Sequence, residues 1–164
     1  MGVVDRASVT EKILIEGEKM WLCESRDSAG FLSLHDCECR KLSINRNAVV
    51  LCMDWMEVLP EHPDNPYAVA HQSGEGQVEF IGCRNVRLTV DGHDIELNNH
   101  SEDIVFQAYE ILDFEIEKIE DYFYAEIYMV QKGPFKEISL GLIFDSDITR
   151  FNELGDESWF VSGC

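Results

Sequence analysis

The amino-acid sequence predicts a mainly β fold, an antiparallel β-sandwich or open barrel, and three observations support this prediction. Apolar and polar residues alternate with a period of two in several segments. Short turn sequences separate these segments, and the clearest is Asp91-Gly92 between two alternating runs. The same runs are rich in aromatic and β-branched residues, which favour strands. This mainly β fold has room for one short helix, and an α+β arrangement is the alternative.

The N-terminal half is expected to begin with one ambiguous segment and continue with strands. Residues 10–25 form either a hairpin that pivots at Gly17 or a short helix. Asn45-Arg46-Asn47 is a predicted hairpin turn, because Asn tolerates left-handed backbone angles. Residues 47–59 follow as a strand, and its alternation places Val49, Leu51, Met53 and Trp55 on one face.

The C-terminal half contains two predicted hairpins and a second ambiguous segment. One hairpin turns at Asp91-Gly92, and the other turns at 132–134 into a strand over 135–144. Residues 103–121 fit a helical stripe, but Leu112, Phe114 and Ile116 also alternate with acidic residues. The aromatic and β-branched content favours strands there, and a helix remains the alternative.

The 164 residues are most simply one domain, 1–164, with a long loop at about 60–77. This loop holds three of the four prolines and exceeds the usual ~4–6 residues of a connection. Long loops often bind ligands, so Trp55, His62, Tyr67 and His71 are candidate ligand contacts, and Trp159 is a further stacking candidate. A hairpin excursion without a function is the alternative.

The charge balance of 13 basic against 32 acidic residues gives a formal net charge of −19. Such a charge opposes binding to nucleic acid and to anionic membranes, and it attracts a basic protein partner. A partner-binding surface is predicted along the second ambiguous segment, at Glu110, Asp113, Glu115, Glu117, Glu120 and Asp121. The alternative is a solvated face that only maintains solubility.

A cytoplasmic protein is expected, because the sequence begins without a recognisable secretory signal and has no apolar stretch near the ~20 residues of a membrane span. The six cysteines lie partly in apolar runs such as VVLCMDW, where they behave as small core residues with free thiols. The oligomeric state is left open.

Two motifs suggest catalysis or metal binding, and both are interpreted as structural. GLIFDSDIT places Asp145 and Asp147 as in haloacid-dehalogenase-type phosphatases, but only fifteen residues without a lysine follow, and the neighbouring strands read as antiparallel. LHDCEC offers His35, Cys37 and Cys39, whose outer pair would lie ~13 Å apart on a strand. We therefore expect no catalytic residue, no metal and no cofactor.

The order of segments resembles that of a loose group of small uncharacterised bacterial β-rich proteins. The resemblance rests on FLSLHDCECRKLSINRNAVVLCMD, GQVEFIGCRNVRL, an acidic Tyr-Glu-Ile strand and FKEISLGLIFDSDI, and it covers roughly residues 31–148. Some members look like immunity proteins of polymorphic toxin systems. The resemblance implies a β-rich fold and a toxin-neutralising role. Together with the acidic charge and the lack of a catalytic motif, it leads us to expect a non-enzymatic protein-binding domain, an immunity-like inhibitor of a basic toxin. A small-ligand or carbohydrate-binding module is the alternative function.

Overall fold

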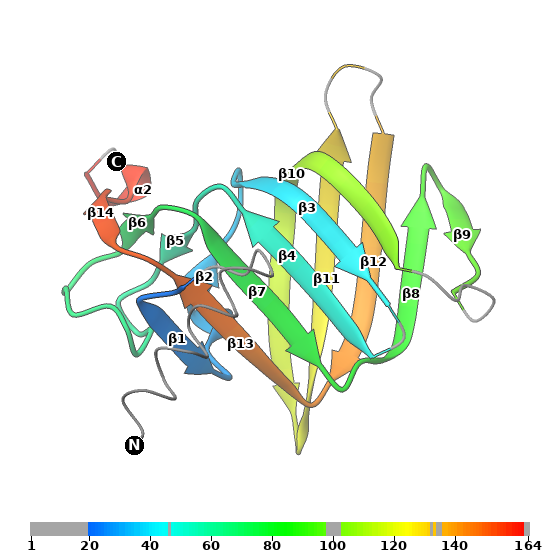
Figure 1. Ribbon diagram of the computed structural model, residues 1–164, viewed down its shortest axis with the longest axis horizontal. Coiled ribbons are helices and arrows are strands. Elements are labelled where there is room, and N and C mark those ends of the chain that lie inside the picture. The colour runs from blue at the N-terminus through cyan, green and yellow to red at the C-terminus, as the bar shows by residue number, and fades with distance from the viewer. Residues whose placement is uncertain (1–19, 46, 98–102, 132, 134–135, 163–164) are drawn as a thin grey trace, which may run out of the picture.

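The computed structural model describes residues 20–45, 47–97, 103–131, 133 and 136–162 (Figure 1). Strands dominate this part of the chain. In order, the elements are β1 (Cys23–Arg26), η1 (Ala29–Phe31), β2 (Leu32–Ser33), β3 (Glu38–Ile44), β4 (Ala48–Met53), β5 (Glu57–Val58), β6 (His71–Ser73), β7 (Gly76–Ile81), β8 (Arg84–Val90), β9 (His93–Ile95), β10 (Ile104–Ile119), β11 (Tyr122–Gln131), β12 (Lys136–Phe144), β13 (Ser146–Phe151), β14 (Leu154–Glu157) and α2 (Trp159–Ser162).

The strands form two antiparallel sheets, which confirms the predicted mainly β class. The large sheet has the order β1-β13-β7-β4-β3-β10-β11-β12-β8-β9, and the small one has the order β14-β6-β5-β2. Among the described strands, the large sheet runs from β1 to β9 without closing on itself, so it is open. The helical alternative for residues 103–121 is wrong, because Ile104–Ile119 is one long strand.

The strand β10 joins two halves of the large sheet. Its first part, Ile104 to Glu110, pairs with β3, and its second part, Glu110 to Ile119, pairs with β11. Ala108 adopts a left-handed φ of 64°, and the register with β11 shifts between Ile111 and Asp113. These two irregularities occur where β10 passes from one half to the other, and β-bulges bend and twist strands in this way. In Figure 1 the half formed by β3, β4, β7 and β13 lies in front of β11 and β12.

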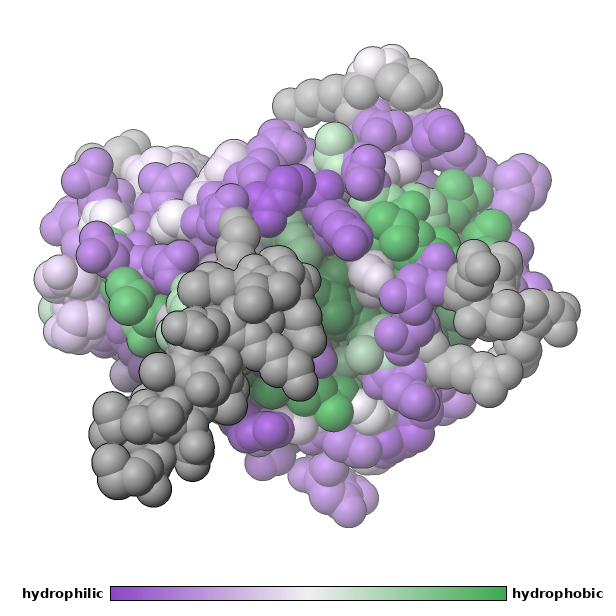
Figure 2. Space-filling view, viewed as in Figure 1, coloured by the Kyte–Doolittle hydropathy of each residue, from purple (hydrophilic) through white to green (hydrophobic). Residues whose placement is uncertain are grey.

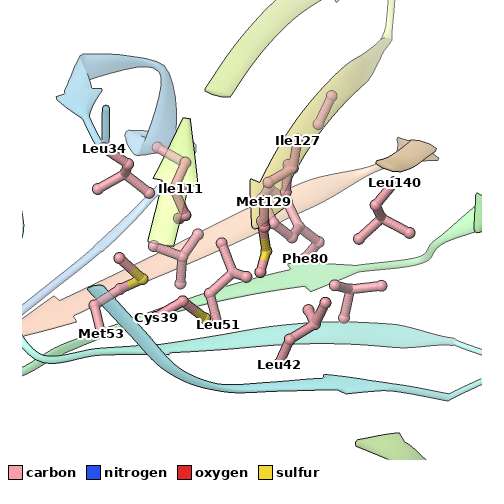
Figure 3. Packing of buried hydrophobic residues seen from close by; sticks show 14 of the residues in the cluster. Leu34, Cys39, Leu42, Leu51, Met53, Phe80, Ile111, Ile127, Met129 and Leu140 are labelled. Carbon is pink, nitrogen blue, oxygen red and sulfur yellow. The ribbon is translucent and has the colours of Figure 1, made fainter. Parts of the chain in front are cut away.

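The core lies between these halves. Phe80 of β7 packs edge-on against Phe144 of β12, with ring centroids 4.7 Å apart, although the two strands are far apart in the sheet order. Figure 3 shows Leu51 of β4 and Met129 of β11 among the apolar side chains that gather there. Figure 2 shows apolar residues in the middle of the molecule and hydrophilic residues around its rim.

The predicted alternation holds in the two best strands. Val49, Leu51 and Met53 are fully buried, and so are the inward residues of β12, namely Ile138, Leu140, Leu142 and Phe144. Trp55 was expected to continue the first set, but β4 ends at Met53 and Trp55 is only half-buried beside the core.

The turns follow their predicted chemistry with one difference. Asp91 and Gly92 both have positive φ, 50° and 81°, as a two-residue type I′ hairpin requires. Asn45 acts differently from the prediction, because its backbone is not left-handed and its side chain accepts hydrogen bonds across the turn. Its Oδ1 accepts the N–H groups of Asn47 and Ala48 at 2.9 and 2.8 Å. Of the ambiguous segment 10–25, residues 10–19 lie outside the described residues, and Cys23 to Arg26 form β1.

The small sheet occupies one end of the molecule beside α2 (Figure 1). The segment expected to be a long loop at 60–77 contributes β6 to this sheet and leads into β7 at Gly76. Asn65 fixes the remaining part, because its Nδ2 donates to the carbonyl oxygens of Val58, Leu59 and Val69 at 3.0 to 3.2 Å. Among the described residues, no helix is long and apolar enough to cross a membrane.

Candidate binding face

The outward side of β10 and β11 carries three of the acidic residues predicted for partner binding, Asp113, Glu115 and Glu117. We call it the acidic face and define it by six outward side chains: Asp113, Glu115, Glu117, Tyr124, Glu126 and Tyr128. Strand alternation explains it, because the neighbouring Phe114, Ile116 and Ile127 turn toward the core. Since β11 lies behind β4 in Figure 1, this face turns away from the viewer.

Two carboxylates stand directly opposite each other on this face. The register pairs Glu115 with Glu126, and both side chains are exposed. Like charges in directly opposed positions destabilise a sheet by roughly 0.2–1 kcal/mol. The arrangement therefore costs stability that a neutral or oppositely charged pair would not cost.

No positive side chain among the described residues lies within ion-pair distance of Glu115, Glu117 or Glu126. Two arginines form ion pairs elsewhere: Arg40 with Asp54 and Glu75, and Arg84 with Asp145. Arg87 reaches this face only through a hydrogen bond to the Tyr124 hydroxyl, at 3.4 Å. The remaining ion-paired arginine, Arg150, contacts Glu24 and Glu79. Lys118 follows Glu117 in β10, but its ammonium group lies over the ring of Phe123, 5.8 Å from the centroid.

Two tyrosines order the carboxylates of this surface. The Tyr124 hydroxyl donates to Glu126 at 2.7 Å, and the Tyr128 hydroxyl donates to Glu137 at 2.8 Å. These hydrogen bonds to carboxylates raise the pKa of both tyrosines, so both remain protonated donors at neutral pH. Glu126 and Glu137 are thus each held in place by a tyrosine hydroxyl.

A groove of about 390 Å³ crosses the sheet beside these tyrosines. Gly141 of β12 forms part of its floor, and a Cβ there would meet the Tyr124 hydroxyl at 3.3 Å. Arg87 lies across from Gly141 and donates to the Tyr124 hydroxyl at 3.4 Å. Asp94, Asp113 and Glu126 also line the groove, so it offers several acceptors and one guanidinium donor.

The six residues predicted for partner binding do not form one continuous row. Asp113, Glu115 and Glu117 share the acidic face, whereas Glu120 and Asp121 lie in the β10–β11 turn, where Glu120 has φ 56°. Glu110 lies before the register shift, half-buried and opposite Glu38 of β3. The prediction missed Glu126, Tyr124 and Tyr128, although their alternation in YFYAEIYMV is a signal that they share a face.

The candidate ligand residues of the loop separate into two places. Tyr67 stacks on His71, with ring centroids 3.9 Å apart, and His71 Nδ1 lies 2.8 Å from the Gly155 carbonyl oxygen. His62 is buried and contacts Thr149 instead. Trp55 is half-buried against the core, and Trp159 is exposed on α2. Only Tyr67 and His71 therefore meet.

His62 and Thr149 form a buried pair that superficially resembles a base and a nucleophile. The Asp64 N–H donates to His62 Nδ1 at 3.1 Å, so Nε2 carries the proton and donates to Thr149 Oγ1 at 3.0 Å. Burial lowers the pKa of His62, which keeps the ring neutral. A protonated Nε2 cannot accept the threonine proton, and Thr149 is fully buried, so the pair stabilises the fold.

Asp145 and Asp147 point to different environments. Asp145 is exposed and contacts Arg84 at 2.6 Å. Asp147 is buried, and its Oδ1 accepts the N–H groups of Ser28 and Ala29 at 3.1 and 3.0 Å. Burial raises the pKa of Asp147 to about 6. The two carboxylates are therefore not arranged to share a metal ion or a phosphoryl group.

The residues of LHDCEC also separate. His35 is exposed in a turn, with Nδ1 2.5 Å from the Leu112 carbonyl oxygen, whereas Cys37 and Cys39 are buried in the core. Burial raises the pKa of both thiols to about 12, which disfavours the thiolate that a metal or a nucleophilic reaction needs. Within the described ranges, no group of three or more His, Cys, Asp or Glu residues is placed to hold a metal ion.

Comparison of the chain with protein-family models, with curated proteins and with solved structures finds no match.

Proposed function

We propose that this protein is a non-enzymatic, cytosolic protein-binding domain whose acidic face binds a cationic protein. The finer form of the proposal is an immunity-like inhibitor of a basic toxin. The observation that carries it is the directly opposed pair Glu115 and Glu126, which has no cation within ion-pair distance among the described residues. A cationic partner would replace repulsion with attraction at that position.

The net charge supports the same function. A protein with a formal charge of −19 attracts a basic partner over a distance, which mainly accelerates association. Tyr124 and Tyr128 add aromatic surface beside the carboxylates, and tyrosine is enriched where proteins bind one another. The five described cysteines, Cys23, Cys37, Cys39, Cys52 and Cys83, are unpaired, as is usual in a reducing cytosol.

Affinity capture with charge-matched baits tests this function. The wild-type protein and two double variants are used, Glu115→Gln with Glu117→Gln, and Glu153→Gln with Asp156→Asn near β14. Each variant loses two negative charges from exposed positions. We expect a Lys- and Arg-rich protein that the wild type and the β14 variant retain and the β10 variant loses. The purified pair should then bind more weakly as salt rises. Equal capture by all three baits contradicts the proposal.

A second function is favoured by the groove over Gly141. Its carboxylates, the Arg87 guanidinium and the Thr89 and Ser139 hydroxyls could bind adjacent hydroxyl groups of a small carbohydrate, with a tyrosine ring beside them. Gly141→Val would fill this groove and suits a strand. Glycan binding that the valine variant loses would support this second function, and glycan binding that it keeps would contradict it.

A further inference from the structure

The second part of β10 has an open backbone edge. Pairing with β3 ends at Glu110, and the last backbone hydrogen bonds on that side join Ile111 to Asp36 and Cys37 at 2.8 and 2.9 Å. From Asp113 to Ile119, β10 pairs with β11 alone among the described residues. Seven residues of strand extend about 23 Å, enough to pair with a short extended peptide.

A hollow of about 510 Å³ lies beside this edge. Phe114, Ile116 and Glu117 of β10 line it together with Gly30 of η1, an element that packs close to β10. A Cβ built on Gly30 would meet no atom within 4 Å, so a larger side chain has room at this residue of the hollow. Tyr124 and Glu126 also line this hollow, which places it next to the acidic face.

The charge along this edge disfavours pairing with a second copy of this chain and favours pairing with a basic segment. A second copy of this chain, paired edge to edge, would bring two rows of carboxylates together, and charged edge strands prevent such self-association. A strand with basic side chains opposite Glu115 and Glu117 would be attracted instead. Its alternate side chains would lie on the other side, beside the half-buried Phe114 and Ile116.

We propose that the open edge of β10, Asp113 to Ile119, binds an extended segment of the partner by strand addition. The segment has alternating basic and apolar residues: its backbone continues the sheet, its basic side chains contact Glu115, Glu117 and Glu126, and its apolar side chains contact Phe114 and Ile116. Main-chain hydrogen bonds provide affinity in this mode, and the alternate side chains provide specificity. This inference rests on the proposed function, because it names the form in which a cationic partner binds.

Peptide titration tests the inference. A fluorescent peptide in which lysine and valine alternate is compared with one in which proline replaces each valine. Both have the same charge, but proline lacks the N–H that a sheet requires. We expect the valine peptide to bind the wild-type protein at least about tenfold more tightly than the proline peptide, a difference of about 1.4 kcal/mol.

Two glycine variants locate the binding. Gly30→Leu adds a bulky side chain to a residue that lines the hollow, and Gly74→Leu is the matched control, because a Cβ on either glycine meets no atom within 4 Å. We expect Gly30→Leu to weaken binding of the valine peptide about tenfold and Gly74→Leu to leave it unchanged. Circular dichroism checks that both variants fold, and the proline peptide provides a test that needs no variant.

The outcomes separate strand addition from the proposed function. If both peptides bind equally and only Glu115→Gln with Glu117→Gln weakens them, strand addition is wrong and the acidic face still binds cations. If neither peptide binds, strand addition is also wrong, and the capture experiment decides the proposed function independently. Tighter binding of the valine peptide that Gly30→Leu leaves unchanged would place the added strand elsewhere and overturn the assignment to β10.

Discussion

Replacing Glu115 with lysine should stabilise the fold while weakening partner binding. In the native protein Glu115 faces Glu126 across the β10–β11 ladder, and the change turns a like-charge contact into an opposite-charge contact. Removing the repulsion and adding an attraction each contribute roughly 0.5 kcal/mol in a directly opposed pair, so the free energy of unfolding should rise by about 1 kcal/mol. For a domain of this size, that corresponds to an increase in Tm of about 2–4 °C.

The assay is urea or thermal unfolding at low salt, repeated at about 1 M salt, where the Debye length falls to about 3 Å. Glu117→Lys is the control, because Glu117 faces Tyr124 and not a carboxylate. It should gain less than half as much stability. The reasoning is refuted if Glu115→Lys gains nothing, or if both variants gain equally at every salt concentration. A gain in stability with a loss of binding is the usual trade-off at a functional surface.

Three further predictions concern the interior and the bend of β10. Asp147→Asn should remove part of the pH dependence of the free energy of unfolding. Burial raises the pKa of Asp147 to about 6, so between about pH 4 and pH 6 the native state keeps a proton that the unfolded chain has lost. The stability that this protonated carboxyl contributes is fully present below about pH 4 and is lost as the pH rises through 6. Urea unfolding at pH 5 and pH 8 should therefore show that the stability of the asparagine variant, relative to the wild type, is greater at pH 8 than at pH 5. Parallel pH profiles of the two proteins would contradict this. Ala108→Gly should raise the free energy of unfolding by about 1 kcal/mol, because Ala108 has φ 64°, and a loss of stability would argue against that backbone. Burial raises the thiol pKa values of Cys37 and Cys39 to about 12, so a thiol reagent at pH 8 should leave both unreacted in the native protein. In unreduced, unfolded protein the reagent should react with all six thiols. Rapid labelling of Cys37 or Cys39 in the native state would contradict their burial.

The fold class was predictable because local rules and tertiary structure agree along most strands. Alternation in β12 identifies its inward face, and Asp91-Gly92 has the backbone chemistry that its hairpin needs. The segment 103–121 was ambiguous, because its apolar and acidic residues fit both the 3.6-residue period of a helix and the two-residue period of a strand. The structure resolves the ambiguity through pairing with β3 and β11, partners that lie on both sides of it in the sequence.

The parts that could not be predicted depend on register and on long-range packing. The opposition of Glu115 and Glu126 follows from the shift near Leu112, and no glycine or proline in the sequence marks that shift. The burial of His62 follows from its contact with Thr149, 87 residues away, so a loop residue that suggested ligand binding lies in the interior. The open edge of β10 exists because β3 begins only at Glu38, so that its pairing with β10 stops at Glu110.

Backbone amide spectra of isotope-labelled protein, recorded during titration with the lysine–valine peptide, test the central claim about the acidic face most directly. We predict that the largest shift changes fall on Asp113–Glu117 and on Tyr124–Glu126, and that they shrink as salt rises. The acidic residues Glu153 and Asp156, which carry the same charge in another part of the surface, provide an internal reference. Shift changes of equal size at Glu153 and Asp156, or none in β10 and β11, would contradict the assignment of this face as the binding surface.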